Sequence, residues 1–96
     1  MELEQIQSEM VPLLDRLVSQ VDDDGVEGAR PFFASIRMSI EDASTTEDLM
    51  PAFQKLSLSA FQGFVFGPAS FVLLDRVLER AEGIATTLAY GSGTRH

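Results

Sequence analysis

The sequence predicts an all-α fold, an up-and-down four-helix bundle with antiparallel neighbours and short loops. Three observations support this prediction. Apolar residues recur at alternating spacings of three and four in four separate stretches, which is the period of one helix face. Turn residues separate the stretches, and the two-residue alternation of β-hairpins does not occur. With 96 residues, the chain has room for one core.

The first stretch ends at three consecutive aspartates followed by Gly25, a residue that favours a left-handed helix cap. Pro12 lies inside it, so we expect either a kink there or a separate arm over residues 2–10. The second stretch has Pro31 in its first turn, which predicts a helix start near Arg30. The two apolar stripes are Leu3, Ile6, Met10, Leu13 and Leu17, and then Val26, Ala29, Phe33, Ile36 and Ile40.

The third stretch opens with two pairs that have capping-box spacing, Ser44 with Glu47 and Thr45 with Asp48. Pro51 lies one turn inside, so we expect the start of this helix to tilt or split. The stripe that follows is Leu49, Phe53, Leu56 and Ala60, joined by Phe61 and Phe64.

The fourth stretch begins at Gly67, with Pro68 at the first helical position. Its expected core stripe is Phe71, Leu74, Leu78, Ala81, Ala85 and Leu88, with Val77 and Ile84 in an adjoining row. We expect one domain over residues 1–90 and a flexible C-terminal tail over residues 91–96.

The chain is acidic, with a net charge of −8. Residues 1–48 hold 12 acidic residues and three arginines, whereas residues 49–96 hold three acidic and four basic residues. Phosphate backbones are bound by clustered lysine and arginine, so we expect no direct nucleic-acid binding. Residues 56–74 lack charge, but polar residues and a Gly-Pro pair interrupt them, so we expect no membrane insertion. The N-terminus does not resemble a signal peptide, which favours a cytoplasmic location.

The side chains needed for catalysis are scarce. There is no cysteine and the single histidine is His96, which excludes disulfides, thiolate metal sites and histidine-dependent triads. The acidic turn over residues 22–27 does not match a calcium loop, because its acids are consecutive rather than alternate. We therefore expect a protein that is not an enzyme and that holds no cofactor and no metal.

The segment from residue 61 to residue 71 packs four of the seven phenylalanines around a turn. These rings either plug one end of the bundle or project outward as a self-association or partner site. Val65 and Phe66 lie off the third stripe, so we expect them to project. The candidate interaction residues are Phe61, Phe64, Val65, Phe66, Phe71 and Phe32.

These observations favour a non-enzymatic protein–protein interaction module, an acidic helical adaptor, regulator or inhibitor that forms a homodimer. Two alternatives remain open. One is a carrier that holds a small apolar ligand in the bundle or in a dimer seam. The other is an acidic mimic of nucleic acid, in which residues 1–48 occupy the groove of a basic partner.

Overall fold

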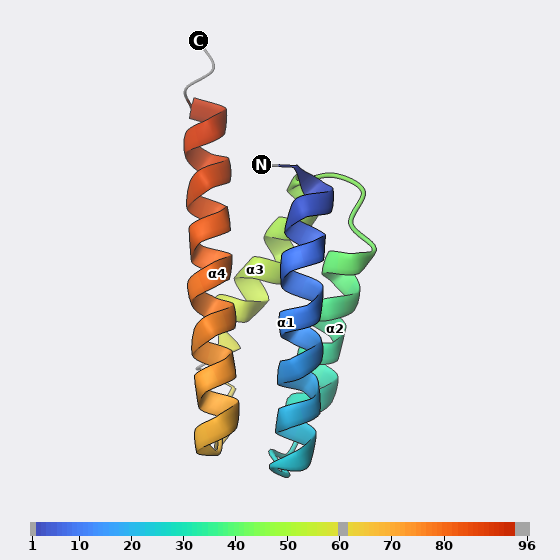
Figure 1. Ribbon diagram of the computed structural model, residues 1–96, viewed down its shortest axis with the longest axis vertical. Coiled ribbons are helices and arrows are strands. Elements are labelled where there is room, and N and C mark those ends of the chain that lie inside the picture. Colours follow the sequence, from blue (N-terminus) through green and yellow to red (C-terminus); the bar gives the residue numbers. More distant parts are fainter. Residues whose placement is uncertain (1, 60–61, 94–96) are drawn as a thin grey trace.

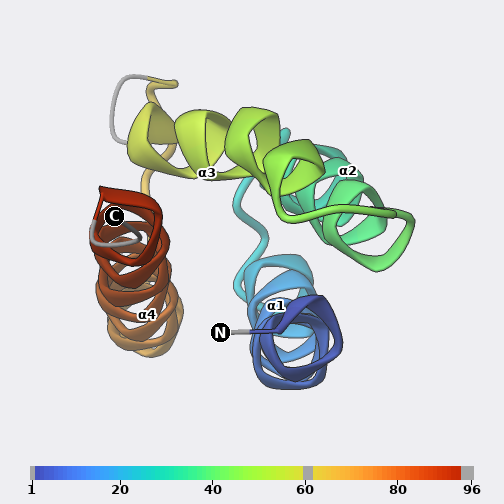
Figure 2. The same ribbon diagram turned by 90° about the horizontal axis from the view of Figure 1, so that it is seen from above.

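The computed structural model describes residues 2–59 and 62–93, with side chains through residue 89. The helices are α1 (Leu3–Asp23), α2 (Ala29–Glu41), α3 (Met50–Ser57) and α4 (Pro68–Gly93), and a 3₁₀ turn, η1 (Glu47–Leu49), precedes α3. Helix α1 packs against α2 and α4, which run antiparallel to it, and the short α3 crosses obliquely and contacts both α2 and α4 (Figures 1 and 2). No strand occurs in the described ranges. The predicted all-α four-helix bundle is confirmed.

Helix α1 is continuous over 21 residues, although Pro12 lies inside it. The expected alternative of a separate arm over residues 2–10 is therefore wrong. Proline within a helix costs about 3 kcal/mol, because it removes a hydrogen bond and crowds the preceding turn. Ile6 and Met10, on the N-terminal side of Pro12, are fully buried. Each buried side chain of this size contributes about 1.5–3 kcal/mol, so the two together offset the proline.

The turn between α1 and α2 closes α1 with a Schellman motif. Gly25 has a φ of 67°, the left-handed conformation that the sequence predicts. The N–H of Val26 donates to the carbonyl of Val21 at 3.0 Å, and the N–H of Gly25 donates to the carbonyl of Asp22 at 3.1 Å. Val21 and Val26 both belong to the buried core. The chain then enters α2 through Gly28, whose φ is 79°.

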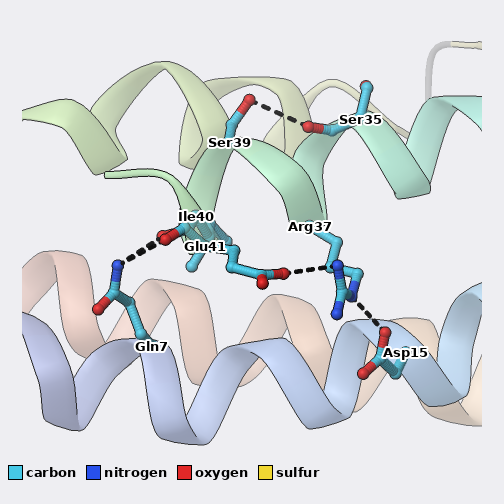
Figure 3. Close-up of polar contacts among 7 residues, drawn as sticks. All are labelled: Gln7, Asp15, Ser35, Arg37, Ser39, Ile40 and Glu41. Carbon is cyan, nitrogen blue, oxygen red and sulfur yellow. Dashed lines mark hydrogen bonds and ion pairs between the residues drawn. The ribbon is translucent and has the colours of Figure 1, made fainter. Parts of the chain in front are cut away.

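Polar contacts fix α2 against α1 (Figure 3). Gln7 of α1 caps the C-terminus of α2, where carbonyls lack partners within the helix. Its Nε2 donates to three backbone carbonyls at 3.0–3.1 Å, those of Ile40, Glu41 and Ala43. Arg37 of α2 pairs with Asp15 of α1 and, at 2.6 Å, with Glu41 of its own helix.

The start of α3 follows the sequence signals. The Asp48 carboxylate accepts a hydrogen bond from the N–H of Thr45 at 3.2 Å, and the Thr45 hydroxyl accepts one from the N–H of Asp48 at 3.3 Å. This is the reciprocal pattern of a capping box. Pro51 lies in the first turn of α3, directly after η1, so the helix start is split as expected.

Helix α3 ends at Ser57, so Phe64 lies in a non-helical connection and not on the expected helical stripe. The Ser57 hydroxyl donates to the Gln54 carbonyl at 2.8 Å, a local bond that competes with helix propagation. Gly63 in the connection has a φ of 78°, which a right-handed helix does not allow. Ala60 and Phe61, also expected on this stripe, lie outside the described residues.

The buried face of α4 is rotated about the helix axis from the stripe that the sequence predicts. Phe71 is 60% exposed, and Leu78 and Ala85 are half-buried. The fully or nearly buried positions are Ser70, Leu74, Val77, Ala81 and Ile84. Two apolar rows lie side by side on this helix, and the row that contains Val77 and Ile84 is the fully buried one, while α4 as a whole packs against α1 and α3. The backbone helix runs to Gly93, three residues past the expected domain end, and residues 94–96 of the expected tail lie outside the described residues.

Candidate interaction surfaces

Four phenylalanine rings pack together where α2 meets the connection between α3 and α4. Phe33 is fully buried at the centre of this aromatic cluster. Its ring centroid lies 5.1 Å from that of Phe32, 6.0 Å from that of Phe64 and 6.1 Å from that of Phe66. The ring centroid of Phe64 lies 5.4 Å from that of Phe32 and 5.8 Å from that of Phe66. These distances are typical of favourable aromatic pairs, so the four rings stabilise this part of the bundle.

The aromatic cluster accounts for three of the candidate interaction residues, Phe32, Phe64 and Phe66. The expectation that Phe66 projects outward is wrong, because its half-buried ring packs on Phe33 and Phe64. Val65 is 86% exposed, as expected. The connection has no regular secondary structure here, and burial alternates along it, with Phe64 and Phe66 half-buried and Val65 exposed between them. The two phenylalanines therefore face inward and the valine between them faces solvent, while Phe61 lies outside the described residues.

Asp24 joins the end of α1 to the start of α4, a contact that sequence reasoning missed. Its carboxylate accepts hydrogen bonds from the hydroxyl of the fully buried Ser70 and from the Gln20 amide, the latter at 2.9 Å. These two bonds hold the pKa of Asp24 below its ordinary value. Gly67 leaves room for the contact, since a Cβ there would lie 3.0 Å from Oδ2 of Asp24. Negative charge is favourable at a helix N-terminus, so Asp24 stabilises the start of α4.

Large apolar side chains remain exposed mainly within one part of the chain. Among the described residues, six such side chains are exposed, and four of them fall within residues 56–74, the segment without charge. We name these four the charge-free surface: Leu58, Val65, Phe71 and Val72. Val65 and Phe71 belong to the candidate set from the sequence, while Leu58 and Val72 were missed. The other two exposed side chains, Met38 and Met50, lie on α2 and α3.

A second apolar feature is a groove between α3 and α4, with a volume of about 440 Å³. Its apolar lining consists of Met50, Phe53, Leu56, Leu78, Ala81 and Ala85. Gln54, Ser57 and Glu82 complete the lining, so among the described residues one carboxylate is the only charged group on its walls. Sequence reasoning assigned Leu78 and Ala85 to the core stripe, and the short α3 leaves them at the wall of this α3–α4 groove instead.

The polar side chains of the described residues do not form a reactive arrangement. Glu9 of α1 pairs with Arg80 of α4 across the bundle. The buried hydroxyl of Ser59 has no hydrogen-bond partner in this part of the chain, so no base activates it as a nucleophile. Within the same residues, no three acidic or histidine side chains are close enough to hold a metal ion. None of the described helices has both the length and the apolar character that crossing a membrane requires.

No protein-family model, curated protein or solved structure matches this chain.

Proposed function

We propose that this protein is a non-enzymatic interaction module that self-associates through the charge-free surface. The observation that carries the proposal is the coincidence of exposed apolar side chains with an uncharged segment. Four of the six exposed large apolar residues described lie within residues 56–74. Exposed apolar patches are typical of protein–protein contacts, and these four side chains share one uncharged segment of the chain.

The distribution of charge favours a second copy as the occupant of this surface. Residues 1–48 carry a net charge of −9, whereas residues 49–93 hold three acidic and three basic residues and are neutral. Two molecules of charge −8 repel each other, and like charges brought together at an interface are costly. The charge-free surface lies in the neutral part, and the charged residues that lie beside Val72 are balanced, two acidic and two basic, so two copies can meet there without a net repulsion: Asp75, Glu79, Arg76 and Arg80.

The size of the surface supports a reversible dimer. Full burial of one large apolar side chain contributes about 1.5–3 kcal/mol, and the four side chains here are already partly covered. Eight such side chains from two copies contribute on the order of 10 kcal/mol, comparable with the cost of association, about 4–15 kcal/mol. We therefore expect a dissociation constant in the micromolar range or weaker.

Substitution of Phe71 by serine tests the proposal. Phe71 and Met38 are each 60% exposed, but Met38 lies outside the charge-free surface, so Met38→Ser is a matched control. We predict that Phe71→Ser and Val65→Ser each weaken self-association about tenfold and that Met38→Ser leaves it unchanged. Sedimentation velocity from about 5 µM to about 500 µM covers the expected range.

Phe66 is unsuitable for this test, because its ring belongs to the aromatic cluster and its loss would destabilise the fold. Circular dichroism of each variant checks that the helices are retained. A wild-type protein that stays monomeric over the whole range would contradict the proposal. If Met38→Ser weakened self-association as much as Phe71→Ser and Val65→Ser, that result would contradict the proposal as well.

A further inference from the structure

We propose that the α3–α4 groove binds an amphipathic helix of a different protein, one whose apolar ridge is flanked by lysine or arginine. This surface is separate from the charge-free surface, since none of its lining residues belongs to that set. The inference concerns a second partner and does not require self-association.

The groove exists because two neighbouring helices differ in length. Helix α3 has 8 residues and α4 has 26, which correspond to about 12 Å and about 39 Å. Helix α3 also crosses α4 obliquely, so most of α4 extends beyond it (Figures 1 and 2). The apolar flank of α4 that faces α3 is therefore covered over only part of its length.

The dimensions of the groove match a docked helix. On α4, its wall runs from Leu78 to Ala85, seven residues or about 10.5 Å along the axis. A docked helix presents its anchors at positions i, i+3 or i+4, and i+7, which span the same distance. Ala81 and Ala85 are small and allow the backbone of a partner to come close. Met50 is 44% exposed at the rim, and its flexible side chain adapts to different anchors.

The charge of the walls selects a basic partner. Among the described residues, Glu82 is the only charged residue that lines the groove. A second copy would bring another Glu82 to the same place, and a fatty acid would bring its own carboxylate, so like charges would meet in both cases. Lysine or arginine beside an apolar ridge instead meets the carboxylate of Glu82, and the net charge of −8 steers such a helix toward the protein.

Two designed peptides test this inference with the full chain. Both are helical, have about 15 residues and carry leucines at positions i, i+4 and i+7, and one has lysines and the other glutamates beside the leucines. Fluorescence anisotropy measures their affinities. We expect the lysine peptide to bind at least about tenfold more tightly than the glutamate peptide. Equal affinities, or tighter binding of the glutamate peptide, would overturn the inference.

Matched variants then locate the binding site. Glu82→Lys and Glu79→Lys change the net charge equally, but Glu79 does not line the groove. We expect Glu82→Lys to reduce the preference for the lysine peptide about fivefold and Glu79→Lys to reduce it less than twofold. Met50→Ser, at the rim, should weaken binding about tenfold, whereas Met38→Ser on α2 should not.

Equal effects within either pair would show that the peptide binds elsewhere and would overturn the inference. Sedimentation velocity of Met50→Ser separates the two proposals, because this variant should lose the peptide and retain self-association.

Discussion

At the scale of single residues, the contacts that organise the bundle divide into local and distant ones. Local signals are readable from the sequence, as the capping box of Thr45 and Asp48 and the left-handed Gly25 show. Two further caps join residues more than 30 positions apart, Gln7 with the end of α2 and Asp24 with Ser70. No spacing rule connects such pairs. They depend on how the helices pack and could not be predicted from sequence.

Asp24 gives a prediction at this scale. Acidic groups at the C-terminus of α1 are unfavourable, but the Asp24 carboxylate also lies at the N-terminus of α4, where it is favourable. Its pKa is lowered in the folded state, so its stabilising effect is present above its unfolded pKa of about 3.9 and is lost as pH falls through the folded value. We predict that Asp24→Asn lowers the melting temperature at about pH 7 and that the difference from wild type shrinks by about pH 3.

Asp23→Asn is the control for Asp24→Asn. It removes the same charge from the same helix end, and Asp23 is exposed and lies in the last turn of α1. We expect it to leave the melting temperature unchanged or slightly raised at neutral pH, since it removes an unfavourable charge from a helix C-terminus. Equal melting temperatures for the two variants at neutral pH would show that the bond to Ser70 does not stabilise the fold.

At the scale of the elements, the sequence predicts the four helices better than it predicts their lengths and rotations. Proline in the first turn locates the starts of α2 and α4, and a capping box followed by proline locates the start of α3. Helix α4, however, carries two adjacent apolar rows, one through Phe71 and Leu78 and the other through Val77 and Ile84. Both rows have the helical period, so the sequence does not show which one the other helices cover. The early end of α3 was also missed, and it is what leaves the α3–α4 groove open.

Two glycines test the role of helix ends. Gly25 has a φ of 67° and Gly83 lies inside α4, and a Cβ added at either position meets nothing within 4 Å. The backbone conformation therefore decides the effect of alanine. We predict that Gly25→Ala lowers the free energy of unfolding by about 1 kcal/mol, because alanine is strained in the left-handed conformation that the helix cap requires. Gly83→Ala should raise it by about 0.5–1 kcal/mol, because alanine is the better helix former.

Urea unfolding followed by circular dichroism measures both glycine variants. The two substitutions are chemically identical, so a general effect of the added methyl group would have the same sign in both. Opposite signs are expected, and equal signs would show that the caps of this bundle contribute little to its stability.

At the scale of the whole molecule, the dominant feature is the uneven charge. The half of the chain that forms α1 and α2 carries 12 acidic residues, and the half that forms α3 and α4 is close to neutral. Both proposed surfaces lie in the neutral half, where copies can meet with little repulsion. The acidic half contributes the long-range attraction of a basic partner toward the molecule.

The same asymmetry predicts how salt affects stability. The acidic residues of α1 and α2 repel one another in the folded state, and salt raised from about 10 mM to about 150 mM shortens the screening length from about 30 Å to about 8 Å. Ion pairs such as Arg80 with Glu9 are in direct contact and are screened less than the repulsion between distant charges. We therefore predict that the melting temperature rises by several degrees over this range.

Two variants separate this repulsion from other effects of salt. Glu27→Gln removes one charge from the acidic half, and Glu79→Gln removes one from the neutral half. Glu27→Gln should raise the melting temperature at low salt and make it less dependent on salt, because one repulsive charge is gone. Glu79→Gln should neither raise the melting temperature at low salt nor reduce its dependence on salt. Melting curves recorded well below the concentration of self-association isolate the monomer. A melting temperature that falls as salt is added would mean that the ion pairs outweigh the repulsion. Repulsion between the acidic halves would then not determine where two copies meet.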